Sequence, residues 1–381
     1  MLLHTNAWRP GAGWVAPWPA GLDSPTTFAV LFGGGTAADC MEAIDDVAAR
    51  LPQAVRVGCS TAGGIRDAHV EDVTLTVAVA RFASTGMRQV ALPIASDDDS
   101  FAVGRRLGDS LCSPGLRAVF VLSDGLHVNG SQLAAGLAAS LPPGVAVTGG
   151  LAGDGERFGT TWVLAGGAPR ERQVAAVGFF GDKLRVGHGC DAGWAPFGPE
   201  RRVTRSTGSV LHELDGKPAL ALYKSYLGER AAGLPATALL FPLSIRRDAD
   251  DPHPLIRTIL GVDEAAQTLT FAGDIPEGQL ARLMRTNIER LIQSAGHAAK
   301  DAAHDFPADA APLAISVSCV GRRLVLGERT DEEIESVRDA LPRGAVQVGF
   351  YSYGEMSPRG AGSMCDLHNQ TMTVTLIDEV A

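Results

Sequence analysis

The chain has 381 residues, of which 45% are hydrophobic and 20% are charged. This composition is typical of a globular protein with a sizeable core, and the length suits two domains. A formal net charge of −10 and the lack of any long Lys/Arg run argue against a nucleic-acid partner.

The six cysteines are spread through the chain and form no C-x-x-C pair. This spacing argues against a structural zinc site and against a disulfide framework. The N-terminus has no charged segment followed by an apolar run, so it does not resemble a signal peptide. No apolar stretch reaches the roughly 18 residues that cross a bilayer. We therefore expect a cytoplasmic, reduced protein without a membrane partner.

The first part of the chain predicts an arm and then a β-α-β-β unit. Residues 1–27 carry three tryptophans among prolines and glycines and are expected to pack on the body. A helix is expected from about Thr36, where Thr36 and Asp39 match a capping box. The segment 59–64 is rich in Gly and Ser. The strands predicted here are Phe28–Phe32, Val55–Gly58 and Val73–Phe82.

The same order of elements recurs twice, each time with a glycine-rich segment, and a fainter fourth copy lies between these repeats. The second copy has strands at Ala118–Leu122, Val145–Thr148, Thr160–Leu164 and Gln173–Phe180, and a helix at Ser131–Leu141. The third has strands at Leu313–Val320, Val346–Tyr353 and Thr371–Ile377, and a helix at Thr330–Leu341. The fainter copy has strands at Ala238–Ile245 and Thr268–Phe271, and a helix at Pro276–Ala295.

These repeats predict a mixed α/β fold of two lobes, built from repeated β-α-β-β units whose mixed sheets are covered by helices. Glycine and proline punctuate the chain at 195–215, where we place the boundary. The predicted division is an N-terminal arm (1–27), a first domain (28–195) and a second domain (196–381).

The stretch Val346–Glu379 holds two predicted strands around a loop that carries Glu355, His368 and Asn369. Glutamate is rarely buried without a partner, and glycines allow close approach to a ligand. Two interpretations stay open: a hairpin with a solvated loop, or the wall of a ligand pocket.

Several motifs resemble the FIST family over nearly the whole chain. G-W-A-P-F-G-P-E-R-R-V-T (193–204), G-F-Y-S-Y-G-E (349–355) and L-H-N-Q-T-M-T (367–373) resemble the FIST C domain. V-G-C-S-T-A-G-G (57–64) and G-G-L-A-G-D-G (149–155) resemble the FIST N domain. The resemblance implies a bacterial signal-input protein that binds a small ligand. One subgroup consists of stand-alone haem proteins that sense nitric oxide and control a partner histidine kinase.

This resemblance suggests haem b as a cofactor, with nitric oxide as the signal. A haem needs an imidazole or thiolate ligand and an apolar slot. His188, between two glycines, is the candidate iron ligand, with Cys190 and Trp194 nearby. Arg201 and Arg202 are candidates to pair with the propionates. The simpler alternative is that His188 is a loop residue bonded to a carbonyl group.

A haem-free sensor of an amino acid or other small polar ligand is the second hypothesis. Its pocket residues are expected in the glycine-rich loops and in the stretch 353–369. A homodimer would suit a signalling protein, although no residue argues for one. The segment 58–63 departs from the G-x-S-x-G nucleophile motif, and we expect no enzymatic activity. The candidate pocket residues are Ser60, Thr61, Asp154, Tyr353, Glu355, His368 and Asn369.

Overall fold

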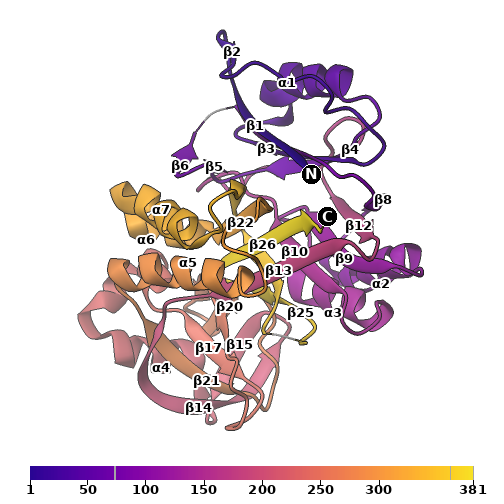
Figure 1. Ribbon diagram of the computed structural model, residues 1–381. Coiled ribbons are helices and arrows are strands. Elements are labelled where there is room, and N and C mark those ends of the chain that lie inside the picture. Colours follow the sequence, from indigo (N-terminus) through magenta and orange to yellow (C-terminus); the bar gives the residue numbers. More distant parts are fainter. Residues whose placement is uncertain (73, 361, 381) are drawn as a thin grey trace.

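The structure is a computed structural model that describes residues 1–72, 74–360 and 362–380 (Figure 1). Val73, the first residue of one predicted strand, lies outside the described residues. Three mixed sheets, here called sheets I, II and III, form a large lobe, and residues 195–285 form a small lobe beside it. Among the described helices, none is long and apolar enough to cross a membrane.

Sheet I contains the first β-α-β-β unit, and helix α1 covers its outer face. The helix begins where predicted, because Thr36 and Asp39 form the capping box. The strands of sheet I, in spatial order, are β11 (Val163–Ala165), β4 (Val55–Ser60), β3 (Thr27–Gly33), β7 (Leu75–Arg81), β1 (Leu2–Arg9) and β2 (Gly13–Trp14), and the helix that covers it is α1 (Ala37–Arg50).

Sheet II contains the second unit, and helices α2 and α3 pack together on its outer face. A short 3-10 helix, Asp97–Asp99, precedes α2. Its strands are β25 (Cys365–His368), β24 (Gly354–Pro358), β10 (Ala146–Leu151), β9 (Leu116–Ser123), β12 (Gln173–Phe180) and β8 (Gly86–Pro93), and its helices are α2 (Ser100–Leu111) and α3 (Gly130–Ser140).

Sheet III contains the third unit, with helices α5, α6 and α7 on its outer side. A 3-10 helix, Gly327–Arg329, joins α6 to α7. Its strands are β6 (His69–Glu71), β5 (Gly64–Arg66), β23 (Val346–Ser352), β22 (Leu313–Cys319), β26 (Met372–Glu379) and β13 (Leu184–Asp191), and its helices are α5 (Ile288–Ala302), α6 (Val320–Leu326) and α7 (Thr330–Ala340).

The three sheets share one strand order, which gives the large lobe an approximate threefold arrangement. In each sheet a parallel pair joined by a helix is followed by an antiparallel third strand: β3, β4 and β7; β9, β10 and β12; β22, β23 and β26. Each unit also lends strands to its neighbour. Strand β11 of the second unit joins sheet I, β24 of the third joins sheet II, and β5 of the first joins sheet III.

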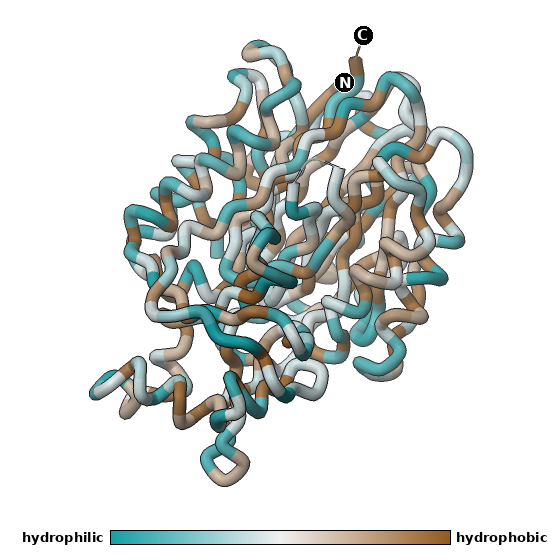
Figure 2. Tube along the Cα trace, turned by 90° about the horizontal axis from the view of Figure 1, so that it is seen from below, coloured by the Kyte–Doolittle hydropathy of each residue, from teal (hydrophilic) through white to brown (hydrophobic). Residues whose placement is uncertain are grey.

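The inner faces of the three sheets share one hydrophobic core. Phe28 of sheet I packs edge-on against Phe120 of sheet II, and Phe32 stacks on Phe350 of sheet III. All four rings are at most 1% exposed. Figure 2 shows hydrophobic stretches along the central strands and mainly hydrophilic outer loops. Hydrophobic and polar residues alternate little along these strands, because both faces of each sheet are covered.

The small lobe is an antiparallel sheet with its own core, inserted between β13 and α5. A single helix, α4, and two 3-10 helices pack on it. Its strands are β18 (Leu255–Arg257), β17 (Leu243–Arg246), β21 (Leu280–Arg285), β14 (Ala195–Thr207), β15 (Val210–Leu214), β20 (Thr268–Phe271), β19 (Ile259–Asp263) and β16 (Lys217–Pro218); its helices are α4 (Ala219–Leu227), Gly228–Gly233 and Ala236–Leu240.

The predicted fold class is confirmed: the sheets are mixed and helices cover them. The faint fourth copy is wrong, since that region is the antiparallel small lobe. The helix expected at Pro276–Ala295 is wrong in its first part. Strand β21 runs to Arg285, and helix α5 begins only at Ile288. Along β21, Ala281 and Leu283 are buried in the small-lobe core, with the alternation that is typical of a strand. This packing determines the structure of the segment, although its apolar residues have helical spacing in the sequence.

Two further expectations change in detail. The predicted arm supplies strands β1 and β2 of sheet I, and its tryptophans pack on the core under α1. The loop expected between the last two strands contains β24 and β25, and its polar side chains are largely buried. The solvated-loop interpretation of this stretch is therefore wrong.

Candidate functional site

The glycine-rich loops of the three units meet on the axis of the large lobe. A ring of three backbone hydrogen bonds joins them: Ala62 donates to the carbonyl of Tyr351, Gly153 to that of Ser60, and Tyr353 to that of Leu151, over 2.9, 3.0 and 3.2 Å. Each loop therefore donates to one neighbour and accepts from the other. These three amides and three carbonyl groups therefore bond to one another.

A cavity of about 590 Å³ lies beside this ring, between the two lobes. Its volume is in the range of small-molecule sites. The large lobe contributes residues of its second and third units, and the small lobe closes the other side. The lining residues used below are Asp97, Gly125, Asn129, Leu151, Phe158, Thr258, Leu260, Ala272, Val320, Gly321, Leu324 and Tyr353.

The lining of this cavity is mainly apolar. Among the described residues that form it, no side chain is basic and Asp97 alone is acidic. Phe158, Leu260 and Leu324 line the cavity and still expose 50%, 52% and 36% of their surface. Exposed apolar residues that cluster around a hollow are typical of binding sites.

Tyr353 is held rigidly at the cavity wall. Its hydroxyl group donates to the Asp154 carboxylate and contacts the carbonyl of Gly155 at 2.9 Å, and it accepts from the Asp154 amide at 3.1 Å. Burial raises the pKa of Tyr353, and the Asp154 carboxylate raises it further. Burial opposes ionisation of Asp154, but hydrogen bonds from Tyr353, Thr160 and Gly159 keep the pKa of Asp154 below its ordinary value. The pair therefore stays a neutral phenol beside a carboxylate.

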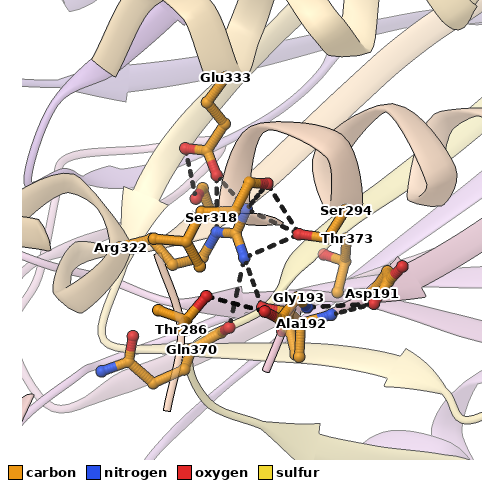
Figure 3. Close-up of polar contacts among 12 residues, drawn as sticks. Asp191, Ala192, Gly193, Thr286, Ser294, Ser318, Arg322, Glu333, Gln370 and Thr373 are labelled. Atoms are coloured by element: carbon orange, nitrogen blue, oxygen red, sulfur yellow. Dashed lines mark hydrogen bonds and ion pairs between the residues drawn. The ribbon is translucent and has the colours of Figure 1, made fainter. Parts of the chain in front are cut away.

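Helix α6 forms another part of the large-lobe wall, and a buried ion pair anchors it from behind (Figure 3). Val320 and Leu324 face the cavity, whereas Arg322 is fully buried. Its Nε lies 2.6 Å from Glu333 Oε1 on α7, and its other nitrogens donate to the carbonyls of Ala192 and Leu291 at 3.0 and 2.8 Å. The position of this wall is thus tied to α5, α7 and the link into the small lobe.

A polar clamp joins the lobes at the edge of the cavity. Asn129 Nδ2 donates to Asp274 Oδ1 at 2.7 Å, and Gln132 Nε2 to Asp274 Oδ2 at 2.6 Å. Arg257, buried in the small lobe, donates to the carbonyl of Leu367 in β25 at 2.9 Å. These contacts set the spacing of the two lobes, and with it the width of the cavity.

The structure places some of the predicted pocket residues at the cavity and others away from it. Tyr353 lines the cavity, and Asp154 lies directly behind it. Ser60 and Thr61 are buried in the axis ring, where their hydroxyl groups bond to backbone atoms of residues 162, 63 and 351. Asn369 is fully buried, and both polar atoms of its side chain lack a partner among the described residues.

Glu355 and His368 lie opposite each other in β24 and β25, away from the cavity lining. The Glu355 carboxylate accepts from Ser352 at 2.6 Å and from the Thr371 hydroxyl group at 2.8 Å. Burial raises the pKa of Glu355 to about 7, although these bonds oppose the shift. Burial lowers the pKa of His368 to about 4, and its Nε2 lies 2.9 Å from the carbonyl of Ser357. This imidazole is therefore neutral.

His188 lies in the middle of strand β13, not in a loop, opposite Thr375. The flanking Gly187 and Gly189 let helix α5 pack closely, because a Cβ at either position would lie 2.0 Å from a helix carbonyl. These glycines therefore serve helix packing. His188 lines none of the four main cavities of the described chain.

The other residues predicted around a haem are also engaged elsewhere. Cys190 Sγ lies 3.5 Å from Nδ1 of His368, and burial raises the thiol pKa. Trp194 donates to the carbonyl of Gln370 at 3.2 Å. Arg201 contacts Tyr226 and Asp215, and Arg202 donates to the carbonyl of Gly278 at 2.7 Å.

These surroundings do not provide the apolar slot that a haem needs. Within the described residues, no group of three or more His, Cys, Asp and Glu side chains is arranged to hold a metal ion. Haem binding and nitric oxide sensing remain predictions from the resemblance alone, and no step below depends on them.

Sequence reasoning missed most of the cavity. Phe158 follows the glycine-rich loop 149–155, but no pattern in the sequence distinguishes the phenylalanine itself. Leu260 and Ala272 belong to the small lobe, whose topology the sequence did not reveal. A signal did exist for α6, because the segment S-C-V-G-R-R (318–323) also resembles the FIST C domain.

A second hollow, of about 660 Å³, lies at the surface between α2 and β8. It is lined by Arg106, Arg170 and Arg172 beside Asp99 and Glu171. All its lining residues come from the second unit, so the other units and the small lobe take no part in it. The cavity between the lobes is therefore the better candidate for a site that could influence the whole chain.

Comparison with known proteins identifies the family of this chain. The FIST N domain matches residues 27–217, and the FIST C domain matches residues 219–358. The chain belongs to the FIST family. FIST domains are associated with sensing in signal transduction and bind small ligands. The two matches meet within the small lobe, between β16 and α4.

The relatives carry no described function. An uncharacterised protein of Methanocaldococcus jannaschii is 32% identical over 193 residues, which is 48% of this chain and 36% of that protein. An uncharacterised protein of Mycobacterium tuberculosis is 26% identical over 244 residues, 61% of each chain. The chain therefore matches less than two thirds of either relative. A solved structure, cyanuric acid hydrolase from A. caulinodans, aligns over 78% of this chain and 100% of its own with 11% identity and a TM-score of 0.18.

Proposed function

We propose that this FIST protein is a sensor that binds a small, uncharged and mainly apolar molecule in the cavity between its lobes. The observation that carries the proposal is the cavity itself: about 590 Å³, apolar, and without a basic side chain among its described lining residues. An anion would find no cation there to pair with, and burying an unpaired charge is costly. An amino acid, the polar alternative, has less support for the same reason.

The position of the cavity suggests how binding could act as a signal. A ligand there would contact the small lobe through Leu260 and the large lobe through Leu324 and Tyr353. A ligand that contacts both lobes favours the arrangement in which its contacts are best, and so shifts the population of states. Because Arg322 ties α6 to α5 and α7, such a shift would reach the outer helices.

The output in this proposal is a contact with a partner protein, for which the family resemblance suggests a histidine kinase. The support is the position of α5 and α7 on the outer side of sheet III: Arg322 on the cavity wall pairs with Glu333 of α7 and donates to the carbonyl of Leu291 in α5.

The test uses Nile red, an uncharged dye that becomes fluorescent in apolar sites. Wild-type protein should bind it with one-to-one stoichiometry. Ala272→Phe should abolish this binding, because Ala272 lines the cavity and the larger ring would occupy it. Ala265→Phe is the matched control, since Ala265 is an exposed residue of the same lobe outside the cavity.

Two results would contradict the proposal. One is the absence of dye binding to the folded wild-type protein. The other is equal binding by wild type and by a folded Ala272→Phe variant, which would place the dye elsewhere. Thermal unfolding of each variant, followed by circular dichroism, establishes that it is folded.

A further inference from the structure

Phe158 occupies an unusual position at the cavity. Its side chain is 50% exposed, although a phenylalanine normally gains stability by burial. Its backbone has a φ of +47°, in the left-handed region that residues with a Cβ rarely adopt. Both features are unfavourable for folding, so packing does not explain why this ring stands here. Such outliers are concentrated at functional sites.

The ring of Phe158 is stacked on the ring of Tyr353. Their centroids lie 4.6 Å apart and their planes differ by 17°. Both residues line the cavity. Tyr353 covers one face of Phe158, and half of the surface of Phe158 remains exposed. An additional flat ring can therefore extend this stack.

The loop that carries Phe158 is fixed at both ends by one carboxylate. Asp154 Oδ2 accepts from the backbone amides of Gly159 and Thr160 at 2.9 and 3.0 Å, directly after Phe158. Asp154 Oδ1 accepts from the Tyr353 hydroxyl group. The same carboxylate thus positions the loop and the ring beneath it. The two aromatic rings form a preorganised wall, which reduces the entropy cost of binding a ligand against it.

We propose that Phe158 and Tyr353 select a ligand with a planar aromatic ring, which stacks on the free face of Phe158. This inference rests on the proposed function, because it concerns the ligand of the same cavity, and it narrows the chemical class from apolar to planar aromatic. Offset stacking between aromatic rings adds attraction beyond the burial of area, whereas a saturated ring of equal size offers only burial.

The experiment compares 2-naphthol with decahydro-2-naphthol by isothermal titration calorimetry. The two compounds share the fused ten-carbon skeleton and the hydroxyl group, but only the first is flat and aromatic. We expect wild-type protein to bind 2-naphthol about three- to tenfold more tightly than the saturated compound, the range given by one aromatic stack.

Phe158→Leu should remove this preference while it leaves binding of the saturated compound within about twofold, because leucine keeps the apolar surface and loses the ring. Phe158→Tyr should keep the preference. Phe101→Leu is the matched control, since Phe101 is an exposed aromatic residue that does not line the cavity. If Phe158→Leu does not fold, the comparison of the two naphthols on wild-type protein carries the test.

The possible outcomes distinguish failure of the aromatic selection from failure of the proposed function. Equal affinity of wild type for both naphthols overturns the aromatic selection and leaves the proposed function standing. An unchanged preference in a folded Phe158→Leu variant also overturns it. Failure of both compounds and of Nile red to bind wild type overturns the proposed function together with the inference.

Discussion

Tyr353 donates a hydrogen bond to the carboxylate of Asp154, which lies 199 residues earlier in the chain. The bond joins the axis loop of the third unit to that of the second, at the wall of the cavity between the lobes. Phe158 is stacked on the same tyrosine ring. Fold stability and the shape of the candidate site therefore depend on one side chain.

Tyr353→Phe should lower the free energy of unfolding by about 1–3 kcal/mol. The substitution keeps the ring and removes the hydroxyl group, which leaves buried groups of Asp154 without a partner. Urea denaturation measures the loss. Tyr226→Phe is a suitable comparison, because Tyr226 bonds to Arg201 at a partly exposed position. A loss at residue 353 no larger than that at residue 226 would contradict this account of the loop.

Arg322→Met should destabilise the protein by about 3–5 kcal/mol. The substitution removes the cation from a fully buried pair and leaves the Glu333 carboxylate without its charge partner. The double variant Arg322→Met with Glu333→Leu should be more stable than the single one, because no charge remains buried. A double variant that is less stable than Arg322→Met would show that Glu333 is not destabilised by loss of its partner. Chemical denaturation of wild type, Arg322→Met, Glu333→Leu and the double variant completes the cycle.

Glu355 should make stability fall as pH rises from about 4.5 to 7. Burial raises its pKa to about 7 in the folded protein, from 4.5 in the unfolded chain. The folded state therefore holds a proton that the unfolded state releases over this range, so unfolding becomes easier as pH increases. The shift corresponds to about 3 kcal/mol.

Glu355→Gln should remove this contribution, since glutamine does not ionise. The measurement is the free energy of unfolding at several pH values between 4 and 8 for both proteins. The difference between variant and wild type should grow in favour of the variant up to pH 7 and then level off. A difference that does not change with pH would contradict the raised pKa.

Gly125→Ala should cost about 1–3 kcal/mol, because a Cβ there would lie 1.9 Å from the carbonyl oxygen of Ala152 and the loop must move. Gly125 also lines the cavity, so Nile red affinity should fall in the same variant. Gly167→Ala is the control, since no atom of the described residues lies within 4 Å of its added Cβ, and its effect should stay within about 0.5 kcal/mol. Equal effects of the two substitutions would be inconsistent with the close contact.

The sequence predicted the repeated unit because each copy carries local signals. Apolar runs such as Phe28–Phe32 indicate buried strands, and Thr36 with Asp39 marks the start of a helix. It did not predict that the three units exchange strands around one axis, because β5, β11 and β24 join the sheets of other units by pairing with residues far away in the sequence.

The candidate site was less predictable than the fold. The motif around Tyr353 and the loop of Asp154 were identified, and the structure brings them together. His188 attracted attention through its glycine neighbours, which the structure explains by the packing of α5. Phe158 was missed, because a positive φ and an exposed ring are properties of the folded backbone and leave no pattern in the sequence.

The most direct test of the central claim is a crystal structure of the protein with 6-bromo-2-naphthol, with the bromine located by its anomalous scattering. The account predicts one strong bromine peak in the cavity between the lobes, with the naphthol ring parallel to Phe158. A peak only outside the cavity, or an empty cavity at saturating ligand, would contradict the claim that this FIST protein binds an apolar molecule between its lobes.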